Sequence, residues 1–473
     1  MVFNSAVFLL FFAGFFPVYW VINNRFSPKI RNLFVLLGSY VFYGYWDWRF
    51  LSLILISSAA DFYLGKRIDG SEDERQRKLF LWLSLGINLG ILGFFKYFNF
   101  FLESFQLLLQ GIGLESNPYS LGIILPVGIS FYTFQTLSYT IDIYRRQLKA
   151  VDDPLQFFTF VAFFPQLVAG PIERARNLLP QFEKPKSFDY DHMIWGMRLI
   201  LYGFFKKVVI ADNFAIWVDA IFLPEANPGG LAVLLGALLF GFQIYCDFSA
   251  YSDIAIGLAA LLGYQLLPNF QTPYFSASFR EFWQRWHISL STWFRDYVYI
   301  PLGGNRNGES AWMRNIFLTF LLSGLWHGAG INFLVWGALH ALLLIAERKI
   351  SLRLQGILAN LWVFILCILL WLPFRAEGFQ HLLELMNQVL HLFEPGQKLR
   401  EIMALIPVGK AISLGAVFVF FILFEKMIAT RDFGDFMKGK KGPFRYSMYY
   451  SLMLAILFLG NFEAEPYFIY FQF

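Results

Sequence analysis

Apolar stretches recur along the whole chain, from Ala6–Ile22 near its start to Met448–Leu459 near its end, and they hold few charges. A stretch of about 20 apolar residues is long enough to cross the hydrocarbon core of a membrane as a helix. Only 15% of the 473 residues are charged and 57% are hydrophobic, whereas about 25% are charged in an ordinary soluble domain. The sequence therefore predicts an all-α, polytopic membrane protein.

Several of these stretches are too short to cross the membrane upright. Leu231–Tyr245 and Ile254–Leu267, for example, are two separate candidates of this kind. Irregular backbone at membrane depth is tolerated only where protein or water surrounds it. We therefore expect short and re-entrant helices around a central cavity or tunnel, in a single domain over residues 1–473. Met1–Ser5 has no basic residue and no small-residue cleavage site follows Ile22, so the first segment is expected to be a retained helix.

Basic residues gather in short loops between the apolar stretches. The positive-inside rule places such loops in the cytoplasm, so the net charge of +5 reflects topology and predicts no nucleic-acid partner. Membrane lipids are the expected surroundings of the chain. Cys246 and Cys367 both lie in apolar runs, which argues against a disulfide or a metal site. The basic residues concerned are Arg25, Lys29, Arg31, Lys66, Arg67, Arg75, Arg77, Lys78, Arg145, Arg146 and Lys149.

The polar insertion after residue 270 contains a segment with helical periodicity, Phe279–Tyr297. Its aromatic residues form one face, and Ser278 with Glu281 fits a capping box that would start the helix. On a continuous helix, its polar residues fall within about 80° of one another and form a stripe that is a candidate substrate-binding surface. On periodicity alone, an interfacial helix with a solvated polar stripe is the favoured interpretation. The stripe consists of Arg280, Gln284, His287, Ser291 and Arg295.

A histidine lies in the apolar stretch "SGLWHGAG", Ser323–Gly330. An ionisable side chain is costly at membrane depth and usually faces the interior of a helix bundle, so His327 is a functional candidate. The glycines around it, Gly324, Gly328 and Gly330, would let a substrate or another backbone approach closely. The alternative is a histidine that hydrogen-bonds between helices, with glycines that serve packing. His340 is a weaker candidate, because on a continuous helix it would point about 140° away from His327.

Other charged residues in apolar surroundings have structural interpretations. Asp247 and Asp253 are six positions apart, which is about 240° of rotation on a helix, so they are not expected to form a catalytic pair. We expect structural hydrogen bonding for both, with Asp247 as a candidate to line the substrate cavity. Lys206 and Lys207 are expected to extend toward the cytoplasmic interface, with their apolar stems in the membrane.

Six motifs, taken together and in order, carry a resemblance. The chain resembles the membrane-bound O-acyltransferases, in particular the bacterial branch that includes the alginate O-acetylation protein, from "MVFNSAVFLLFF" at its start to "YFIYFQF" at its end. The motifs are "LPVGISFYTFQTLSYTIDIYRR" (Leu125–Arg146), "FFPQLVAGPIERA" (Phe163–Ala175), "GFFKKVVIADN" (Gly203–Asn213), "FQIYCDFSAYSDIAIGLAALLGY" (Phe242–Tyr264), "FWQRWHISLSTWFRDYVYIPLGG" (Phe282–Gly304) and "SGLWHGAG" (Ser323–Gly330).

The resemblance implies transfer of an acyl group to a hydroxyl, with His327 as the central catalytic residue and His287 as the second functional position. The two are 327 − 287 = 40 residues apart. A hydroxyl that attacks a thioester loses a proton, which a neutral imidazole can accept near neutral pH. We therefore expect His327 to be the general base. His287 is expected to stabilise charge on the carbonyl oxygen or to orient a reactant. Trp326 and Asp247 are further candidates for substrate contact.

The resemblance also implies a substrate and partners. The expected reaction passes an acetyl group from a cytoplasmic donor, acetyl-CoA, across the bacterial inner membrane for O-acetylation of an extracytoplasmic polysaccharide such as alginate. We expect no bound cofactor, and we expect a partner, either an extracytoplasmic acetyltransferase or an acyl-accepting protein. One alternative is D-alanyl transfer to teichoic acids. Another, from a different class of protein, is a transporter. Many transporters consist of two halves with related sequences, but this sequence contains no such internal repeat.

Overall fold

The computed structural model describes residues 1–114, 121–350, 354–394, 396, 399–429 and 431–462. Over these residues the secondary structure is helical and contains no strand. Six of the described helices are long and apolar enough to cross a membrane, which confirms the prediction of an all-α, multi-pass membrane protein. They are Ala6–Arg25, Glu74–Gly111, Gly230–Leu261, Ile331–Ile350, Ile357–Arg375 and Val408–Ile428.

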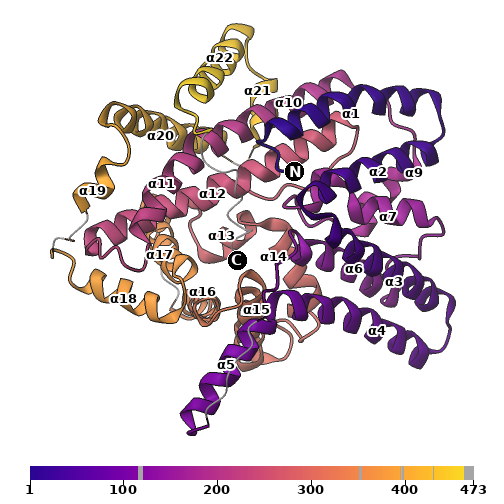
Figure 1. Ribbon diagram of the computed structural model, residues 1–473, viewed down its shortest axis with the longest axis horizontal. Helices are drawn as coiled ribbons and strands as arrows, with labels where there is room; N and C mark the ends of the chain where they lie inside the picture. The colour runs from indigo at the N-terminus through magenta and orange to yellow at the C-terminus, as the bar shows by residue number, and fades with distance from the viewer. Residues whose placement is uncertain (115–120, 351–353, 395, 397–398, 430, 463–473) are drawn as a thin grey trace. The chain divides into compact units, whose positions relative to one another are not determined.

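The contacts divide the chain into two compact units, Met1–Asp189 with Ala259–Leu266, and Tyr190–Leu258 with Leu267–Phe473. The basic residues singled out from the sequence, from Arg25 to Lys149, all belong to the first unit, and most of them lie within its helices and not in loops. Figure 1 draws the first helices of this unit in indigo. Its helices are α1 (Ala6–Arg25), α2 (Pro28–Asp47), α3 (Leu51–Gly70), α4 (Glu74–Leu92), α5 (Phe98–Gly111), α6 (Ile129–Tyr144), α7 (Pro154–Ala162), α8 (Phe164–Leu167) and α9 (Ala175–Glu183).

Polar side chains join three helices of the first unit that lie side by side in Figure 1, α3, α4 and α6. The carboxylate of Asp61 accepts hydrogen bonds from Ser84 Oγ at 2.6 Å and from Asn88 Nδ2 at 2.8 Å. Ser84 Oγ also lies 3.0 Å from Thr140 Oγ1 of α6. All four residues are buried, so these bonds satisfy polar groups that would be costly to leave unpaired.

The second unit contains both candidate histidines and most of the helices. In chain order, its helices are α10 (Tyr190–Phe204), α11 (Asp212–Ile221), α12 (Gly230–Leu261, within this unit up to Leu258), α13 (Phe279–Arg285), α14 (Ile288–Phe294), α15 (Gly308–His327), α16 (Ile331–Ile350), α17 (Ile357–Arg375), α18 (Phe379–Leu390), α19 (Leu399–Ala404), α20 (Val408–Ile428), α21 (Phe433–Lys438) and α22 (Gly442–Leu459). Single π-helical turns follow α10, at Phe205–Ala211, and α14, at Arg295–Tyr299.

Helix α12 differs from the expectation of two separate short segments, because it is one helix of 32 residues. The polar residues between the two expected segments remain helical because they have buried partners. Asp247 and Asp253 each form an ion pair with a buried lysine, and pairing lowers the cost of keeping a carboxylate away from water. A hydropathy scale counts the charge of each carboxylate but does not include the lysine that pairs with it.

Helices α15 and α16 form a hairpin that is packed through glycines. A Cβ atom added to Gly324 would meet the backbone oxygen of Phe333, and one added to Gly337 would meet the backbone oxygen of Phe320. A Cβ atom on Gly328 would meet the ring of Phe333. The glycines near His327 therefore serve close helix packing, which was the structural one of the two interpretations from the sequence.

We expect Gly324→Ala to destabilise the hairpin by about 1–3 kcal/mol, because the added methyl group must displace backbone of α16. Gly14→Ala is the matched control, since nothing lies within 4 Å of a Cβ added there. The melting temperatures of the two variants in detergent provide the measurement. Equal melting temperatures would contradict the packing role of Gly324.

Candidate active site

His287 lies at a break between two short helices. Helix α13 ends at Arg285, and His287 adopts left-handed backbone, with φ 43° and ψ 55°, before α14 begins at Ile288. The backbone N–H of Ile288 donates to the backbone oxygen of Asn269 at 2.9 Å, and that of Gln271 donates to the backbone oxygen of Arg285 at 3.0 Å. The prediction of one continuous helix is therefore wrong, because a neighbouring segment takes hydrogen bonds that a continuous helix would make internally.

The predicted start of α13 is correct, with Ser278 as the N-cap, although the second bond of the predicted capping box comes from Ala277 and not from Ser278. Ser278 Oγ accepts a hydrogen bond from the backbone N–H of Glu281 at 3.0 Å, and the Glu281 carboxylate accepts one from the backbone N–H of Ala277 at 2.7 Å. This local signal was correct because it involves only residues adjacent in sequence.

The break also divides the predicted polar stripe. His287 is fully buried, and Ser291 is half-buried and donates to the backbone oxygen of Trp286 at 3.1 Å. Arg280, Gln284 and Arg295 are exposed. The structure thus does not bring the three exposed side chains together with His287, and their contact with substrate remains a prediction.

The imidazole of His287 is held by an amide and by aromatic rings. Its Nδ1 atom lies 3.1 Å from Oδ1 of Asn269, and the ring of Phe248 packs edge-on at a centroid distance of 4.5 Å. Burial lowers the pKa of His287 well below its ordinary value of 6.5, because an apolar environment disfavours the charged form. Sequence reasoning missed Asn269, which lies outside every motif that was singled out.

His327 is the last residue of α15, and its side chain is buried. Its ring packs edge-on against Trp336 of α16 at 5.1 Å and against Phe374 of α17 at 5.3 Å. Trp326 connects the two candidate histidines, since its ring centroid lies 5.0 Å from that of His327 and 6.0 Å from that of His287. The structure therefore gathers His287, Trp326 and His327 into one buried cluster.

His340 lies nearer to this cluster than the sequence indicated. Its ring packs against Trp336 at 4.7 Å and against Trp283 at 5.0 Å. The angle expected on a continuous helix does not apply, because α15 ends at His327 and a new helix begins at Ile331. His327 and His340 thus pack on the same indole.

Lys206 and Lys207 are buried, so the expectation that they extend to the interface is wrong. Lys206 Nζ lies 2.7 Å from Asp253 Oδ2 and 2.8 Å from Ser249 Oγ, and Lys207 Nζ lies 2.7 Å from Asp247 Oδ1. The lysines belong to the π-helical turn Phe205–Ala211, whose wider winding changes the direction of side chains relative to an α-helix. Both carboxylates of α12 therefore have the structural role that was expected of them, and contact of Asp247 with substrate remains a prediction.

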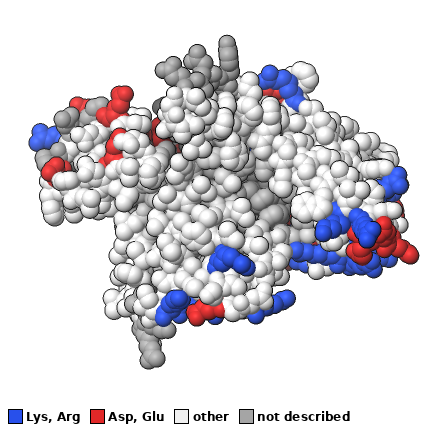
Figure 2. Space-filling model, turned by 90° about the horizontal axis from the view of Figure 1, so that it is seen from below, with Lys and Arg blue, Asp and Glu red and all other residues white. Residues whose placement is uncertain are grey.

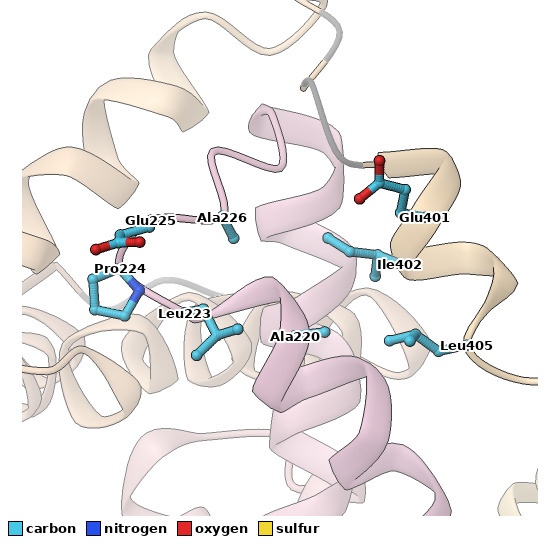
Figure 3. Close-up of a pocket in the computed structure, with 8 residues that line it drawn as sticks. All are labelled: Ala220, Leu223, Pro224, Glu225, Ala226, Glu401, Ile402 and Leu405. Carbon is cyan, nitrogen blue, oxygen red and sulfur yellow. The ribbon is translucent and has the colours of Figure 1, made fainter.

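Two pockets of the second unit lie among described residues away from His287 and His327, which line neither of them. One of about 450 Å³ lies between the end of α11, the segment that follows it and α19 (Figure 3). The other, of about 370 Å³, is lined by Phe205 and by residues of α20 and α22. The expected central cavity around His327 remains a prediction. Within the described ranges, no group of three or more His, Cys, Asp or Glu side chains is placed to hold a metal ion.

Comparison with known proteins shows what this chain is similar to. Residues 148–372, which include both histidines of the cluster, match the family model of the membrane-bound O-acyltransferases. The probable alginate O-acetylase AlgI of Pseudomonas aeruginosa is 44% identical over 388 residues, 80% of this chain and 73% of the relative. The peptidoglycan O-acetyltransferase of Helicobacter pylori is 35% identical over 83% of this chain and 80% of its own. The teichoic acid D-alanyltransferase of Bacillus subtilis is 30% identical over 54% of this chain and 67% of its own.

Proposed function

The chain belongs to the membrane-bound O-acyltransferase family and is an O-acyltransferase, and from this premise we propose that it moves an acetyl group from cytoplasmic acetyl-CoA toward a hydroxyl of an extracytoplasmic polysaccharide such as alginate. The relatives support acetyl over D-alanyl. Those that cover about four-fifths of the chain are named for O-acetylation, whereas the D-alanyltransferase covers about half of it.

The buried cluster of His327, Trp326 and His287 carries the proposal. As a hydroxyl oxygen bonds to the acyl carbon of a thioester, its proton must leave, and the carbon–sulfur bond then breaks to release a thiolate. We assign His327 as the base that accepts this proton and returns it to the thiolate. His287 orients a reactant or stabilises charge on the carbonyl oxygen, an effect that surroundings poor in water would strengthen.

The distribution of charge supports transfer across the membrane. In the second unit, the start of α15, the end of α16 and the start of α13 are neighbours, since Arg348 stacks on Trp312 at 4.1 Å and Glu347 accepts from the backbone N–H of Phe279 at 2.7 Å. This side is rich in basic residues, which favours a cytoplasmic location. His327 ends the 20-residue helix α15, about 30 Å away at 1.5 Å per residue. Basic residues near these helix ends are Arg280, Arg306, Arg314, Arg348 and Lys349.

The surface has the character expected of a membrane-embedded chain. On the face drawn in Figure 2, charged side chains lie in a few groups, and most of the remaining surface is uncharged. We place the protein in the bacterial inner membrane. We also assign it a partner outside the cytoplasm, either a separate acetyltransferase or an acyl-accepting protein that delivers the group to the polysaccharide.

Inverted membrane vesicles that contain the protein test the proposal. With radiolabelled acetyl-CoA outside, and therefore on the former cytoplasmic side, label should appear in polysaccharide or protein inside the vesicles. Label from a D-alanyl carrier protein, with none from acetyl-CoA, would favour the teichoic acid alternative. Polysaccharide movement that needs no acyl donor and survives His327→Ala would favour a transporter.

If the exposed arginines near the break contact the donor, Arg280→Ala or Arg295→Ala should raise its apparent KM by about fivefold, equivalent to about 1 kcal/mol, with kcat little changed. Arg306→Ala, another exposed arginine, is the control. Initial rates across a range of acetyl-CoA concentrations give both constants. A fall in kcat alone would exclude donor binding, and loss of protein from the membrane with normal kinetics in the remainder would favour the interfacial-helix interpretation.

A further inference from the structure

Asn269 forms hydrogen bonds with three consecutive residues at the helix break, His287, Ile288 and Ser289. Its side-chain oxygen accepts from Ser289 Oγ at 2.9 Å and from the backbone N–H of Ser289 at 3.3 Å, and it lies 3.1 Å from Nδ1 of His287. Its amide nitrogen donates to Ser252 Oγ of α12 at 3.0 Å. Its backbone oxygen accepts from Ile288. Asn269, Ser289, Ser252 and His287 are all buried, so the amide is fixed in one environment.

These contacts determine which way the amide faces. A backbone N–H can only donate, so the atom of Asn269 that faces the Ser289 N–H must be the oxygen. The same oxygen faces Nδ1 of His287, and a carbonyl oxygen can only accept. Nδ1 therefore carries a hydrogen, and in a neutral imidazole the lone pair is then on Nε2.

The surroundings of the ring favour the neutral form. Among the described side chains, those that pack on it include Phe248 of α12, Phe270 of the preceding segment and Trp326 of α15, together with the Asn269 amide. All four are uncharged near neutral pH. Burial also lowers the pKa of His287, since the imidazolium would lose hydration without gaining an opposite charge from these neighbours.

We propose that Asn269 is a positioning residue that holds His287 in the Nδ1–H tautomer, so that Nε2 accepts a hydrogen bond from the acceptor hydroxyl and orients that hydroxyl for attack. The inference rests on the proposed function, which left two roles open for His287. A neutral imidazole with its hydrogen on Nδ1 has no Nε2–H to donate to a carbonyl oxygen. His287 can therefore orient the hydroxyl through Nε2, but it cannot stabilise charge on the carbonyl oxygen by donating a hydrogen bond from that atom.

The tautomer can be measured without any substrate. The chain has six histidines, so the full-length protein labelled with ¹⁵N-histidine in liposomes gives a tractable solid-state NMR spectrum, and the His287 signals are those absent from His287→Gln. We expect a protonated Nδ1 and an unprotonated Nε2 between about pH 5 and 8, the range in which an ordinary histidine titrates. A protonated Nε2 at neutral pH, in either the other tautomer or the imidazolium, would overturn the proposal.

The variants at Asn269 provide a second readout. Asn269→Asp keeps an acceptor at Nδ1 but adds a negative charge, so it should raise the pKa of His287, followed by a ¹⁵N NMR titration, by roughly 1–3 units. Asn269→Leu should lower kcat roughly 10- to 100-fold, because the tautomer is no longer fixed. Ser252→Ala is the control, since it removes only the partner of the amide nitrogen and should leave the pKa of His287 unchanged.

A pKa of His287 that is the same in Asn269→Asp and in the unmodified protein would overturn the inference, as would an equal shift in Ser252→Ala. If neither Asn269 variant accumulates in the membrane, the NMR spectrum of the unmodified protein still decides the question. If the unmodified protein transfers no label from acetyl-CoA, the proposed function fails, and the tautomer is again decided by NMR alone.

Discussion

Replacing His327 with alanine is expected to lower acetyl transfer by about 10²- to 10⁴-fold, the usual contribution of a general base, while the protein remains inserted in the membrane. His327→Gln should fail as well, because an amide can form hydrogen bonds but cannot accept a proton near neutral pH. The measurement is label transferred from acetyl-CoA per mole of membrane-inserted protein.

His340→Gln is the matched control for this experiment. His340 is also a buried histidine and packs against the same indole, that of Trp336, as His327 does. We expect the control to keep most of its turnover. A purely structural His327 predicts a different pattern, in which the glutamine variant is active and the alanine variant is unstable. Near-normal turnover in a well-folded His327→Gln protein would refute the assignment of the base.

The second large effect is expected at Lys207. Its amine lies 2.7 Å from Asp247 Oδ1 and 2.9 Å from Asp212 Oδ1, and all three side chains are largely buried. Lys207→Ala would remove a buried cation that pairs with two buried carboxylates, and breaking a buried ion pair from one side typically costs about 3–5 kcal/mol. That is a large part of the roughly 5–15 kcal/mol that stabilises a folded domain. Loss of folded protein in a thermal melt of the detergent-purified chain is the measurement.

Two further variants separate the ion pair from general effects of losing a lysine. Lys426→Ala removes an exposed lysine from α20 and should change the melting temperature little. Lys207→Met with Asp247→Leu removes both charges of one pair and should recover part of the stability lost in Lys207→Ala. A melting temperature for Lys207→Ala equal to that of the unmodified protein would show that the buried pair contributes nothing.

The pocket of Figure 3 has no part in these predictions. Its lining is mostly apolar and comes from α11, the segment after it and α19, with Glu225 and Glu401 as its acidic members. Its residues contribute neither histidine nor any residue of the cluster around Trp326. The chemistry proposed for this chain is therefore assigned to the buried cluster and not to this pocket.

Local and compositional features of the sequence determined the class of fold and the candidate histidines. The low share of charged residues requires a membrane environment, and Ser278 with Glu281 determines the start of α13, since both effects act between a residue and its immediate surroundings. The order of the motifs around His287 and His327 was enough to predict the family. None of these inferences required knowledge of which distant segments meet.

The tertiary structure decided everything that depends on a distant partner. Periodicity assumes an unbroken helix, so it could not predict the break at His287, which the backbone of Asn269 stabilises. Hydropathy counts Lys207 and Asp247 as two isolated charges, although the two form an ion pair inside the unit and α12 continues through Asp247. The tautomer of His287 likewise depends on an amide 18 residues away in the chain, because the position of a proton is determined by the group that accepts it.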